Sequence, residues 1–167
     1  MLISPDDVLR ITANLSDDLS QLLTQIPSGR VSTYGALATA LGNTIASRWV
    51  GKWMLHHDHD DNCPCHRVVR ADGSLGLYID GDQTIQARRL KYENVETCRG
   101  HIDLASYSFS QFQCDRPLRR LSEYQNQIAQ AVQIGFSPQN VRTVGGVDVS
   151  YVSEEKGVAA YCLIDSN

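Results

Sequence analysis

Apolar residues recur at helical spacing in the first part of the chain. They fall three or four residues apart from Val8 to Ile26, and Pro27-Ser28-Gly29 follows them. This spacing predicts one or two helices that end before Pro27. Thr33 and Thr44 are expected to cap two further short helices, which run to about residues 41 and 55. Two short helices around a glycine-containing turn form the helix-turn-helix pattern, which many helical hairpins share.

The pattern changes after this helical region. The stretch 56–62 is polar and is expected to be a loop. Residues 67–70, with Val68 and Val69 at their centre, and residues 75–78 are expected to be short strands on either side of Asp72-Gly73, which predicts a β-hairpin. A further helix is expected from Gln83 to about Tyr92. Residues 16–97 therefore predict helices with a small β-hairpin, a winged-helix-like unit.

The second part of the chain has a different order of predicted elements. Residues 98–117 lack clear periodicity and are expected to be a linker. Apolar residues at helical spacing predict a helix over 118–134, and two strands of alternating or fully buried type are expected over 141–151 and 157–164. The predicted fold class is α+β, with one small domain in residues 1–97 and a separate piece in residues 118–167.

Composition adds bounds to this picture. The 167 residues are 42% hydrophobic and 20% charged, as is usual for a globular protein, and no apolar run is long enough for a membrane span. The N-terminus does not have the form of a signal peptide, so a cytoplasmic protein without a membrane partner is expected. Five cysteines without regular spacing are expected to be free thiols.

Charge bears on the partner. The formal net charge of −4 argues weakly against nucleic acid, yet no acidic residue occurs from Leu19 to His57. That stretch holds both predicted helix-turn-helix helices together with Arg30, Arg48 and Lys52. A DNA-facing element needs such a segment, because phosphates repel carboxylates. From charge alone, an uncharged core stretch with three surface cations explains the pattern equally well.

The sharpest chemical feature is a cysteine followed directly by a histidine. Pro64 precedes Cys65-His66, and a strand is expected after them. A neighbouring imidazole can promote the thiolate, which is the nucleophilic form of cysteine. A buried, inert Cys65 is the competing interpretation, and the residues by themselves favour it slightly.

Metal binding is a second interpretation of the same region. Three histidines, three aspartates and Cys63 precede Cys65-His66 within residues 56–66. Histidine and thiolate both bind zinc, but the spacings match neither C-x₂-C nor H-x₃-H, and one residue between two cysteines is fewer than a zinc knuckle uses. These spacings favour a solvated polar loop over a metal site.

Several motifs occur in a fixed order between residues 26 and 78. They include Val31-Ser32-Thr33-Tyr34-Gly35, Ala46-Ser47-Arg48-Trp49-Val50-Gly51, Pro64-Cys65-His66-Arg67-Val68-Val69 and Asp72-Gly73-Ser74-Leu75-Gly76-Leu77-Tyr78. With these motifs, residues from about 16 to 97 resemble the catalytic domain of the O6-alkylguanine-DNA alkyltransferases. The resemblance implies a winged helix-turn-helix fold and double-stranded DNA carrying O6-alkylguanine as the partner.

The resemblance also implies roles at the site of chemistry. Cys65 would accept the alkyl group once and irreversibly, His66 would take the thiol proton through a water, and Glu93 would orient His66. Tyr34 would donate a proton or a hydrogen bond to the leaving guanine. No cofactor is expected for this transfer. The protein would thus be a single-turnover methyltransferase, acting on a flipped base. The alternative is a non-catalytic module that binds the lesion, but such relatives lack the cysteine.

Further roles follow for DNA and for the substrate pocket. Arg48 would enter the base stack and hold the gap left by the flipped nucleotide. The DNA-binding residues implied are Arg48, Thr33, Tyr34, Lys52 and Arg67, and the pocket residues implied are Tyr78, Ile79, Val68 and Trp53. This chain departs from the family where His57-Asp58 replaces the usual Asn-Pro. With about 15 residues before the shared region, it is expected to lack the family's N-terminal domain.

The second part resembles another family. Residues 121–134, Gly145-Gly146-Val147-Asp148-Val149-Ser150-Tyr151 and Gly157-Val158-Ala159-Ala160 are similar to the start of endonuclease V. That family has an RNase-H-like sheet, uses Mg²⁺ and nicks DNA near deaminated bases. Asp148 would be a metal ligand only in a complete domain, because the other carboxylates would lie beyond Asn167. We therefore expect a fragment of a fusion protein of prokaryotic origin, acting as a monomer, whose second part is inactive here. A full-length form would be a Mg²⁺-dependent endonuclease.

Overall fold

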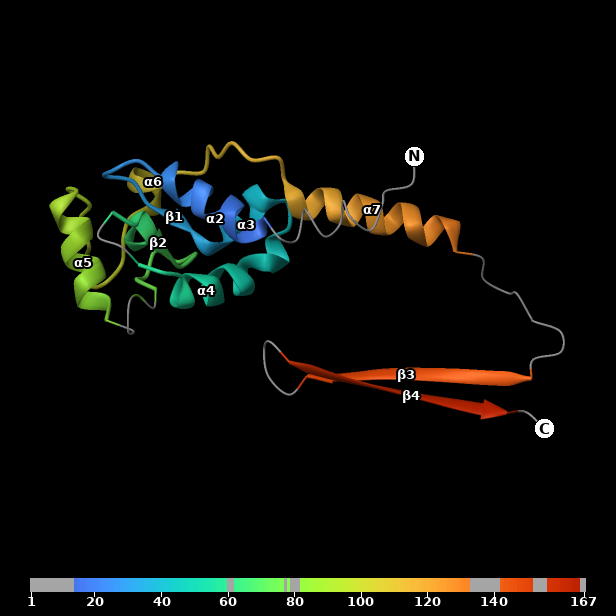
Figure 1. Cartoon of the computed structure of the whole chain (residues 1–167). Coiled ribbons are helices and arrows are strands. Elements are labelled where there is room, and N and C mark those ends of the chain that lie inside the picture. The colour runs from blue at the N-terminus through green and yellow to red at the C-terminus, as the bar shows by residue number, and fades with distance from the viewer. Residues whose placement is uncertain are drawn as a thin grey trace. The chain divides into compact units, whose positions relative to one another are not determined.

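The computed structural model describes residues 14–59, 62–76, 78, 82–132, 142–151 and 156–165. The chain divides into two compact units, Met1–Gln130 and Ala131–Asn167 (Figure 1). None of the helices among the described residues has the length and apolar character needed to cross a membrane. The site residues expected for alkyl transfer all belong to the first unit, apart from Ile79, which lies outside the described residues.

The helix-turn-helix region consists of α3 (Tyr34–Leu41) and α4 (Ser47–His56). The hydroxyl of Thr33 accepts a hydrogen bond from the amide of Ala36 at 3.0 Å, which confirms the predicted N-cap of α3. Gly42 ends α3 with φ at 101°, a conformation that glycine adopts without strain. The predicted cap at Thr44 is wrong. Asn43 caps a 3₁₀ turn (Thr44–Ala46), and α4 begins three residues later than Thr44.

Helix α2 (Leu15–Thr24) precedes this pair, and its apolar face carries Leu19, Leu22 and Leu23 into the core. The helical spacing from residue 15 onward therefore gives a helix, as the sequence predicts. The first half of the expected helix, from Val8, lies outside the described residues.

Two very short strands hold the site together. Strand β1 (Ser32–Thr33) pairs in parallel with β2 (Val68–Val69), and Val69 forms an antiparallel bridge with Leu75. The strand expected over 67–70 is reduced to Val68–Val69, because Pro64–Arg67 forms a 3₁₀ turn. The returning strand expected over 75–78 is wrong for the described residues, where only the bridge at Leu75 remains. The parallel pairing brings residues 32–33, at the start of the helix-turn-helix, beside residues that directly follow the Cys65-His66 turn.

Helix α5 (Gln83–Tyr92) has the predicted bounds, and Asp82 caps it by accepting a hydrogen bond from the amide of Thr84. The core of the first unit forms two clusters. The larger one joins α2, α3 and α4 to Cys65, Val68 and Tyr78, while the smaller one includes Val31, Val69 and Leu90. The alkyl-acceptor candidate therefore belongs to a hydrophobic core.

The sequence predicts a linker over residues 98–117, and the structure corrects this prediction. This segment contains α6 (Leu104–Tyr107) and runs along β1, where the amide of Val31 donates to Tyr107 at 2.9 Å and the amide of Phe109 donates to Val31 at 2.7 Å. Phe109 and Phe112 pack edge to face and lie against the larger core cluster. Their spacing is too irregular to predict an element, but tertiary burial fixes the segment in place.

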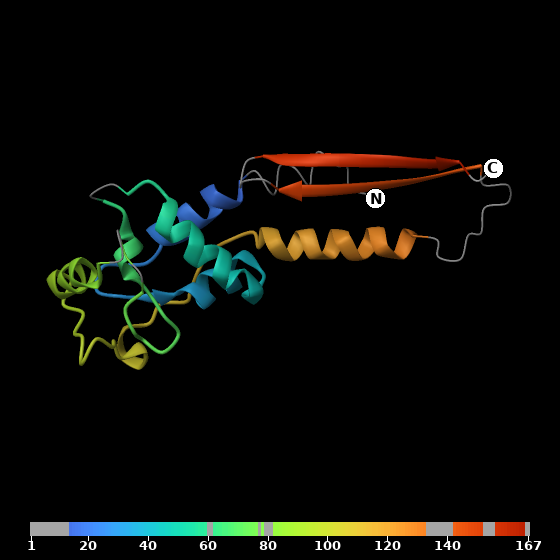
Figure 2. The same ribbon diagram turned by 90° about the horizontal axis from the view of Figure 1, so that it is seen from below.

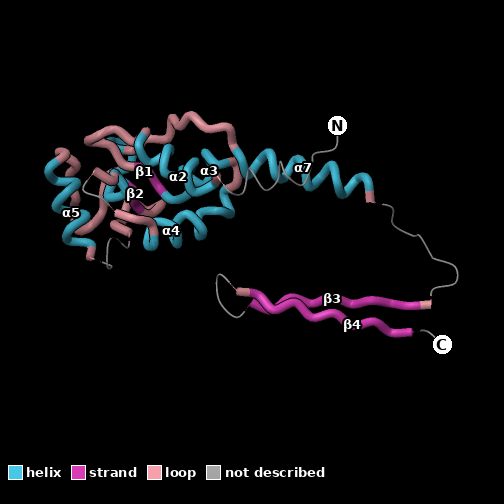
Figure 3. The backbone as a smooth tube through the Cα atoms, in the orientation of Figure 1, coloured by secondary structure: helices cyan, strands magenta, loops and turns pink. Residues whose placement is uncertain are grey.

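Helix α7 (Pro117–Ala131) follows, and then strands β3 (Thr143–Tyr151) and β4 (Gly157–Asp165), close to the predicted ranges. The two strands form an antiparallel ladder in which Asp148 faces Ala160. Figures 2 and 3 show this hairpin from two directions. All positions of both strands are exposed, so the expectation of strands with a buried face is wrong for this chain.

Candidate functional site

The candidate nucleophile sits in the 3₁₀ turn that joins the polar loop to β2. Pro64 begins the turn, and the Cys65 side chain points into the core with only 2% of the residue exposed. The sulfur lies 3.9 Å from the hydroxyl of Tyr78 and 4.0 Å from the carbonyl oxygen of Cys63. Cys65 is thus held in one orientation by its neighbours, as a reacting atom must be.

His66 and Glu93 form the pair that the sequence expects. Nε2 of His66 lies 2.9 Å from Oε1 of Glu93, and His66 is buried. Nδ1 of His66 is also buried and has no hydrogen-bond partner among the described residues. A carboxylate accepts a hydrogen bond, so Nε2 carries the hydrogen in this pair and Nδ1 is left with the lone pair. The geometry fits an imidazole held ready to accept a proton at Nδ1.

Arg67 completes this network. Its Nε and Nη2 donate to the carboxylate of Glu93 at 2.7 to 3.1 Å, and its Nη1 donates to the carbonyl of Ile26 at 2.7 Å. The sequence predicts Arg67 to contact DNA. The structure instead gives its guanidinium an internal role, because all of these bonds are made within the protein.

The network also fixes the charge of Glu93. Burial raises the pKa of this carboxyl, but hydrogen bonds from Arg67, His66 and the amide of Gly29 outweigh burial and lower the pKa to about 2. Glu93 is therefore a carboxylate at neutral pH. A fixed anion at this place orients the ring of His66.

Tyr34, the first residue of α3, reaches the site through a close approach to Gly76. A Cβ at Gly76 would lie 2.1 Å from the hydroxyl of Tyr34, so only glycine leaves room for this side chain. Burial raises the pKa of Tyr34, with a smaller rise from Cys65 opposed by Arg70. Tyr34 is therefore a protonated phenol that can donate a hydrogen bond.

The two thiols Cys63 and Cys65 influence each other. A hydrogen bond with Cys63 raises the pKa of Cys65, and burial and the nearby sulfur raise it further. The same bond lowers the pKa of Cys63, although burial opposes this effect. Cys65 is a neutral thiol in this arrangement and needs a base in order to react.

Apart from Arg67, the residues expected on the DNA side lie on α3 or α4 or, in the case of Thr33, at the N-cap of α3. Arg48 is exposed in the first turn of α4, and Lys52 is exposed one turn further on. Thr33 is half-buried, and its hydroxyl serves as the cap of α3. Arg48 and Lys52 thus lie on one helix, where they can act together on a phosphate backbone.

The predicted pocket residues are placed as follows. Val68 and Tyr78 are buried in the same core cluster as Cys65, with Val68 three residues after it in the chain. Trp53 stacks on His57 at a centroid distance of 4.4 Å. Ile79 lies outside the described residues. Burial raises the pKa of Tyr78, and Cys65 raises it further, so its hydroxyl is protonated beside the sulfur.

Gln86 is a site residue that the sequence reasoning missed. It is buried on α5, and its Nε2 donates to the carbonyl oxygens of His66 and Val68 at 3.0 and 2.9 Å. These bonds tie α5 to the turn that carries Cys65. The signal in the sequence is a glutamine four residues before Leu90, on the apolar face of the predicted helix.

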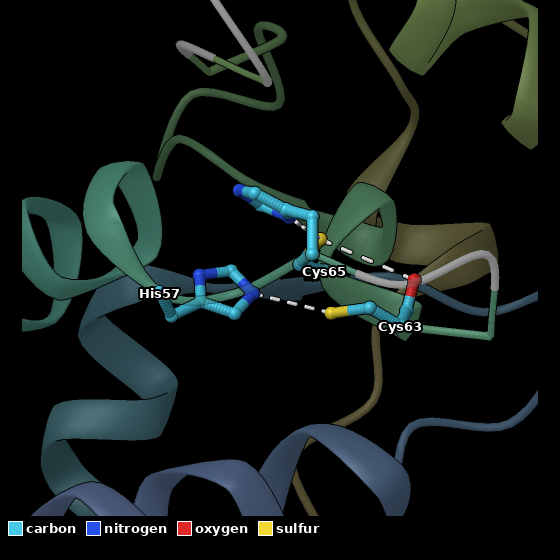
Figure 4. A group of neighbouring side chains, drawn as sticks. His57, Cys63 and Cys65 are labelled. Atoms are coloured by element: carbon cyan, nitrogen blue, oxygen red, sulfur yellow. Dashed lines mark hydrogen bonds between the residues drawn. The ribbon is translucent and has the colours of Figure 1, made fainter.

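The polar loop before Cys65 also differs in part from its prediction. His57, His59 and Cys63 are half-buried, and together with Cys65 they place one potential ligand atom each within 4.8 Å of all the others. Figure 4 shows the His57 ring directed at the sulfur of Cys63, with Cys65 alongside. These three side chains are therefore less exposed than the sequence predicts for a solvated loop. Spacing rules cannot find the cluster, since the loop and the 3₁₀ turn bring the ligands together.

In the second unit, Asp148 is exposed on β3, and its carboxylate accepts a hydrogen bond from the amide of Val149 at 2.9 Å. Within the described parts of the chain, Asp148 belongs to no group of three or more potential metal ligands. Magnesium needs several oxygen ligands in near-octahedral geometry. The residues around Asp148 do not fit a magnesium site on their own.

Comparison with known proteins adds to this geometry. Residues 14–95 match the model of the family described as 6-O-methylguanine DNA methyltransferase, DNA binding domain. The chain is 42% identical over 150 residues to the bifunctional methyltransferase/endonuclease of Picrophilus torridus, a match that covers 89% of this chain and 49% of that protein. The chain thus spans about half the length of this relative, and 44% of the corresponding protein of Thermoplasma volcanium.

Two further matches cover mainly the first unit. The chain is 37% identical over 73 residues to alkyltransferase-like protein 1 of Schizosaccharomyces pombe, a match that covers 43% of this chain and 68% of that protein. Its fold matches the crystal structure of S. pombe Atl1 in complex with damaged DNA containing O6-carboxymethylguanine, with a TM-score of 0.52, 26% identity, and 64% and 98% of the two chains covered. The matched sequence, the α+β fold and the buried Cys65-His66 turn agree, and the chain belongs to the alkyltransferase family defined by the 6-O-methylguanine DNA methyltransferase DNA-binding domain.

Proposed function

We propose that this protein repairs alkylated double-stranded DNA by moving the alkyl group from O6 of a flipped guanine to the sulfur of Cys65. The proposal rests mainly on one observation. The buried Cys65 is followed directly by His66, and Nε2 of His66 is hydrogen-bonded to the carboxylate of Glu93. This is the order of nucleophile, base and orienting group found in activated nucleophiles. The S. pombe structure holds DNA with an O6-alkylated guanine, which supports the same class of substrate.

The proposed alkyl transfer needs only the side chains of the site, a water and the DNA. The sulfur attacks the alkyl carbon, the new S–C bond forms as the C–O6 bond breaks, and the bonding electron pair leaves with the guanine oxygen. The thiol proton passes through a water to Nδ1 of His66, and Glu93 stabilises the resulting imidazolium. Tyr34 donates to N3 of the guanine, so that a neutral base leaves. The thioether is stable, so each molecule reacts once, and the transfer needs no cofactor.

DNA binding is assigned to the helix-turn-helix. Arg48 enters the base stack where the nucleotide flips out, and Lys52 contacts the backbone from the same helix. Thr33 and Tyr34 lie at the start of α3, close to the same surface, and Tyr78, Val68 and Trp53 line the pocket for the base. Few cations are available, so part of the affinity comes from the flipped base, and the salt dependence of binding is shallow.

The test is the mass of the protein after reaction with a duplex that contains O6-methylguanine. The expected result is one methyl group on the peptide that contains Cys65, with none in Cys65→Ser. Cys114→Ser is the matched control, because Cys114 is another partly buried free thiol of the first unit. Tight binding of the duplex without methylation of Cys65 would overturn transfer and favour a non-catalytic lesion-binding module.

For the second part of the chain, we propose an endonuclease V-like segment that begins at about residue 118. Support comes from the relative named bifunctional methyltransferase/endonuclease, whose match spans 150 residues and so includes most of this part. A single carboxylate cannot hold Mg²⁺ by itself, so no cleavage step is assigned to this chain. Incubation with Mg²⁺ and a duplex containing hypoxanthine is expected to give no nicks, and Mg²⁺-dependent nicking by this chain would contradict the assignment.

A further inference from the structure

Four side chains around Cys65 form a cluster that alkyl transfer does not explain. Nε2 of His57 lies 3.2 Å from the sulfur of Cys63 (Figure 4). Nδ1 of His59 lies 3.2 Å from the sulfur of Cys65. All four potential ligand atoms lie within 4.8 Å of one another. In a tetrahedral zinc site with two nitrogens and two sulfurs, ligand atoms are separated by roughly 3.3 to 3.8 Å. Shifts of about 1 Å at the longest pairs would therefore close the cluster around an ion.

The surroundings prepare His57 as a ligand. Its Nδ1 lies 3.0 Å from the carbonyl oxygen of Met54, which can only accept a hydrogen bond. Nδ1 therefore carries the hydrogen, and Nε2 presents its lone pair toward Cys63. Metal-binding histidines commonly donate their other ring N–H to a carbonyl in this way, which fixes the tautomer and the ring orientation. Stacking on Trp53, at 7° between the ring planes, holds the ring further.

His59 lies beside the sulfur of Cys65, where it can control access to that sulfur. Its ring packs edge to face on Tyr78 with a centroid distance of 6.1 Å, and tilts against His57 at 4.0 Å. It thus touches the two residues, Cys65 and Tyr78, that must face the alkyl group during transfer. An ion that fixes His59 there would close the approach to the sulfur.

The cluster is also open to ions from solvent. His57 and Cys63 line a pocket of about 290 Å³ between α2, the end of α4 and the turn at Pro64. The donor set of two imidazoles and two thiols is one that zinc favours over calcium or magnesium, which prefer oxygen ligands. His57 is, moreover, one of the positions where the sequence departs from the alkyltransferase pattern.

We propose that His57, His59, Cys63 and Cys65 bind one Zn²⁺ ion, which engages the sulfur of Cys65 and protects it from alkylation. Binding displaces the protons of both thiols to solvent, so two thiolates balance the charge of the ion. The protein then exists in a zinc-bound, protected form and a zinc-free, reactive form. The effect on transfer rests on the proposed function, whereas the zinc site itself does not.

The first experiment measures binding of zinc alone. The full chain, stripped with a chelator, is titrated with Zn²⁺ against a chromophoric competitor, and native mass spectrometry counts the ions. One ion per chain is expected, and Co²⁺ in its place should give the intense absorption of thiolate ligation. Cys63→Ser and His57→Asn should each weaken binding by at least about 10-fold. Cys114→Ser, at another thiol of the first unit, and His56→Asn, at the imidazole that precedes His57 in the chain, lie outside the cluster and should bind normally.

The second experiment separates the two proposals. Zinc-loaded protein should methylate Cys65 at least about 10-fold more slowly than stripped protein, and added chelator should restore the rate. The ion draws electron density from the sulfur, and it holds His59 across the approach to the sulfur. In Cys63→Ser the rate should no longer depend on zinc. The absence of stoichiometric zinc, or binding unchanged in both ligand variants, overturns the site. Equal rates with and without bound zinc overturn protection. Zinc binding without methylation in either form leaves the site standing and overturns alkyl transfer.

Discussion

The two units of this chain use apolar residues in opposite ways. In the first unit, residues such as Leu22, Leu37 and Val50 are buried in a core that also holds Cys65. In the hairpin of β3 and β4, the large apolar side chains are 49–79% exposed. Both regions contain paired strands, β1 with β2 and β3 with β4, so strand pairing alone does not distinguish them. The two regions differ in how far their apolar side chains are buried, and the candidate nucleophile Cys65 lies in the buried one.

The difference has a physical basis. A two-stranded hairpin gains little stability alone, because each strand has one open edge and the sheet has no layer to pack on. The helical unit removes apolar surface from water, which is the main source of stability and of fixed side-chain geometry. Reactive groups that must be positioned to a fraction of an ångström therefore need a buried core such as that of the helical unit.

The largest expected effect comes from opening the core. Leu22→Ala should lower the free energy of unfolding by about 2–5 kcal/mol, because it removes a fully buried side chain and leaves a cavity. Leu163→Ala, at an exposed position of β4, should change it by less than about 0.5 kcal/mol. Urea unfolding followed by tryptophan fluorescence reports the first unit, because both tryptophans lie in α4. Equal losses in the two variants would contradict the contrast.

The next effect concerns the charge network behind His66. Glu93→Gln should destabilise the first unit by up to about 3 kcal/mol, since it leaves the guanidinium of Arg67 without its partner at a site where both side chains are less than 20% exposed. Glu123→Gln, in the exposed pair with Arg119 on α7, should cost at most about 1 kcal/mol.

The same carboxylate predicts a pH dependence. The pKa of Glu93 falls from 4.5 to about 2 on folding, so its contribution to stability is complete above pH 4.5 and is lost as the pH falls toward 2. Acid titration of the free energy of unfolding should show a steeper loss in this window for the wild type than for Glu93→Gln. Parallel curves would show that Glu93 does not carry this dependence.

A third effect compares two glycines. Gly76→Ala should slow methylation of Cys65 by about 10²-fold, because the new Cβ displaces the hydroxyl of Tyr34. Gly146→Ala in β3 should leave the rate unchanged, since its Cβ would meet the sulfur of Cys162 at an ordinary 3.6 Å. Single-turnover rates on the O6-methylguanine duplex make the measurement, with circular dichroism as the check of folding. A fast Gly76→Ala variant would show that the position of Tyr34 is not needed.

The smallest effect is expected at Asp148. Asp148→Asn should change neither the free energy of unfolding nor the rate of transfer beyond experimental error, because its carboxylate is exposed and bonds only to the next amide. A slower transfer in this variant, measured in the same single-turnover assay, would show that the hairpin influences the first unit.

Much of the local structure follows from local sequence. The cap at Thr33, the bounds of α5 and the two strands of the hairpin depend on neighbouring residues and on periodicity, so they could be predicted. The motif order points in the same way to Cys65, His66 and Glu93. The packing of 98–117 could not be predicted, because aromatic residues at irregular spacing carry no periodic signal before a core exists to receive them.

The sequence by itself determined the family, the helix-turn-helix and the identity of the candidate nucleophile, since these rest on short motifs and local propensity. Only the tertiary structure decided the partner of Arg67, the space that Gly76 leaves for Tyr34, and the meeting of His57 and His59 with two cysteine sulfurs. Each of these depends on contacts between segments whose directions are set by packing. Distances of a few ångströms between such side chains are properties of the folded core, which spacing along the chain does not encode.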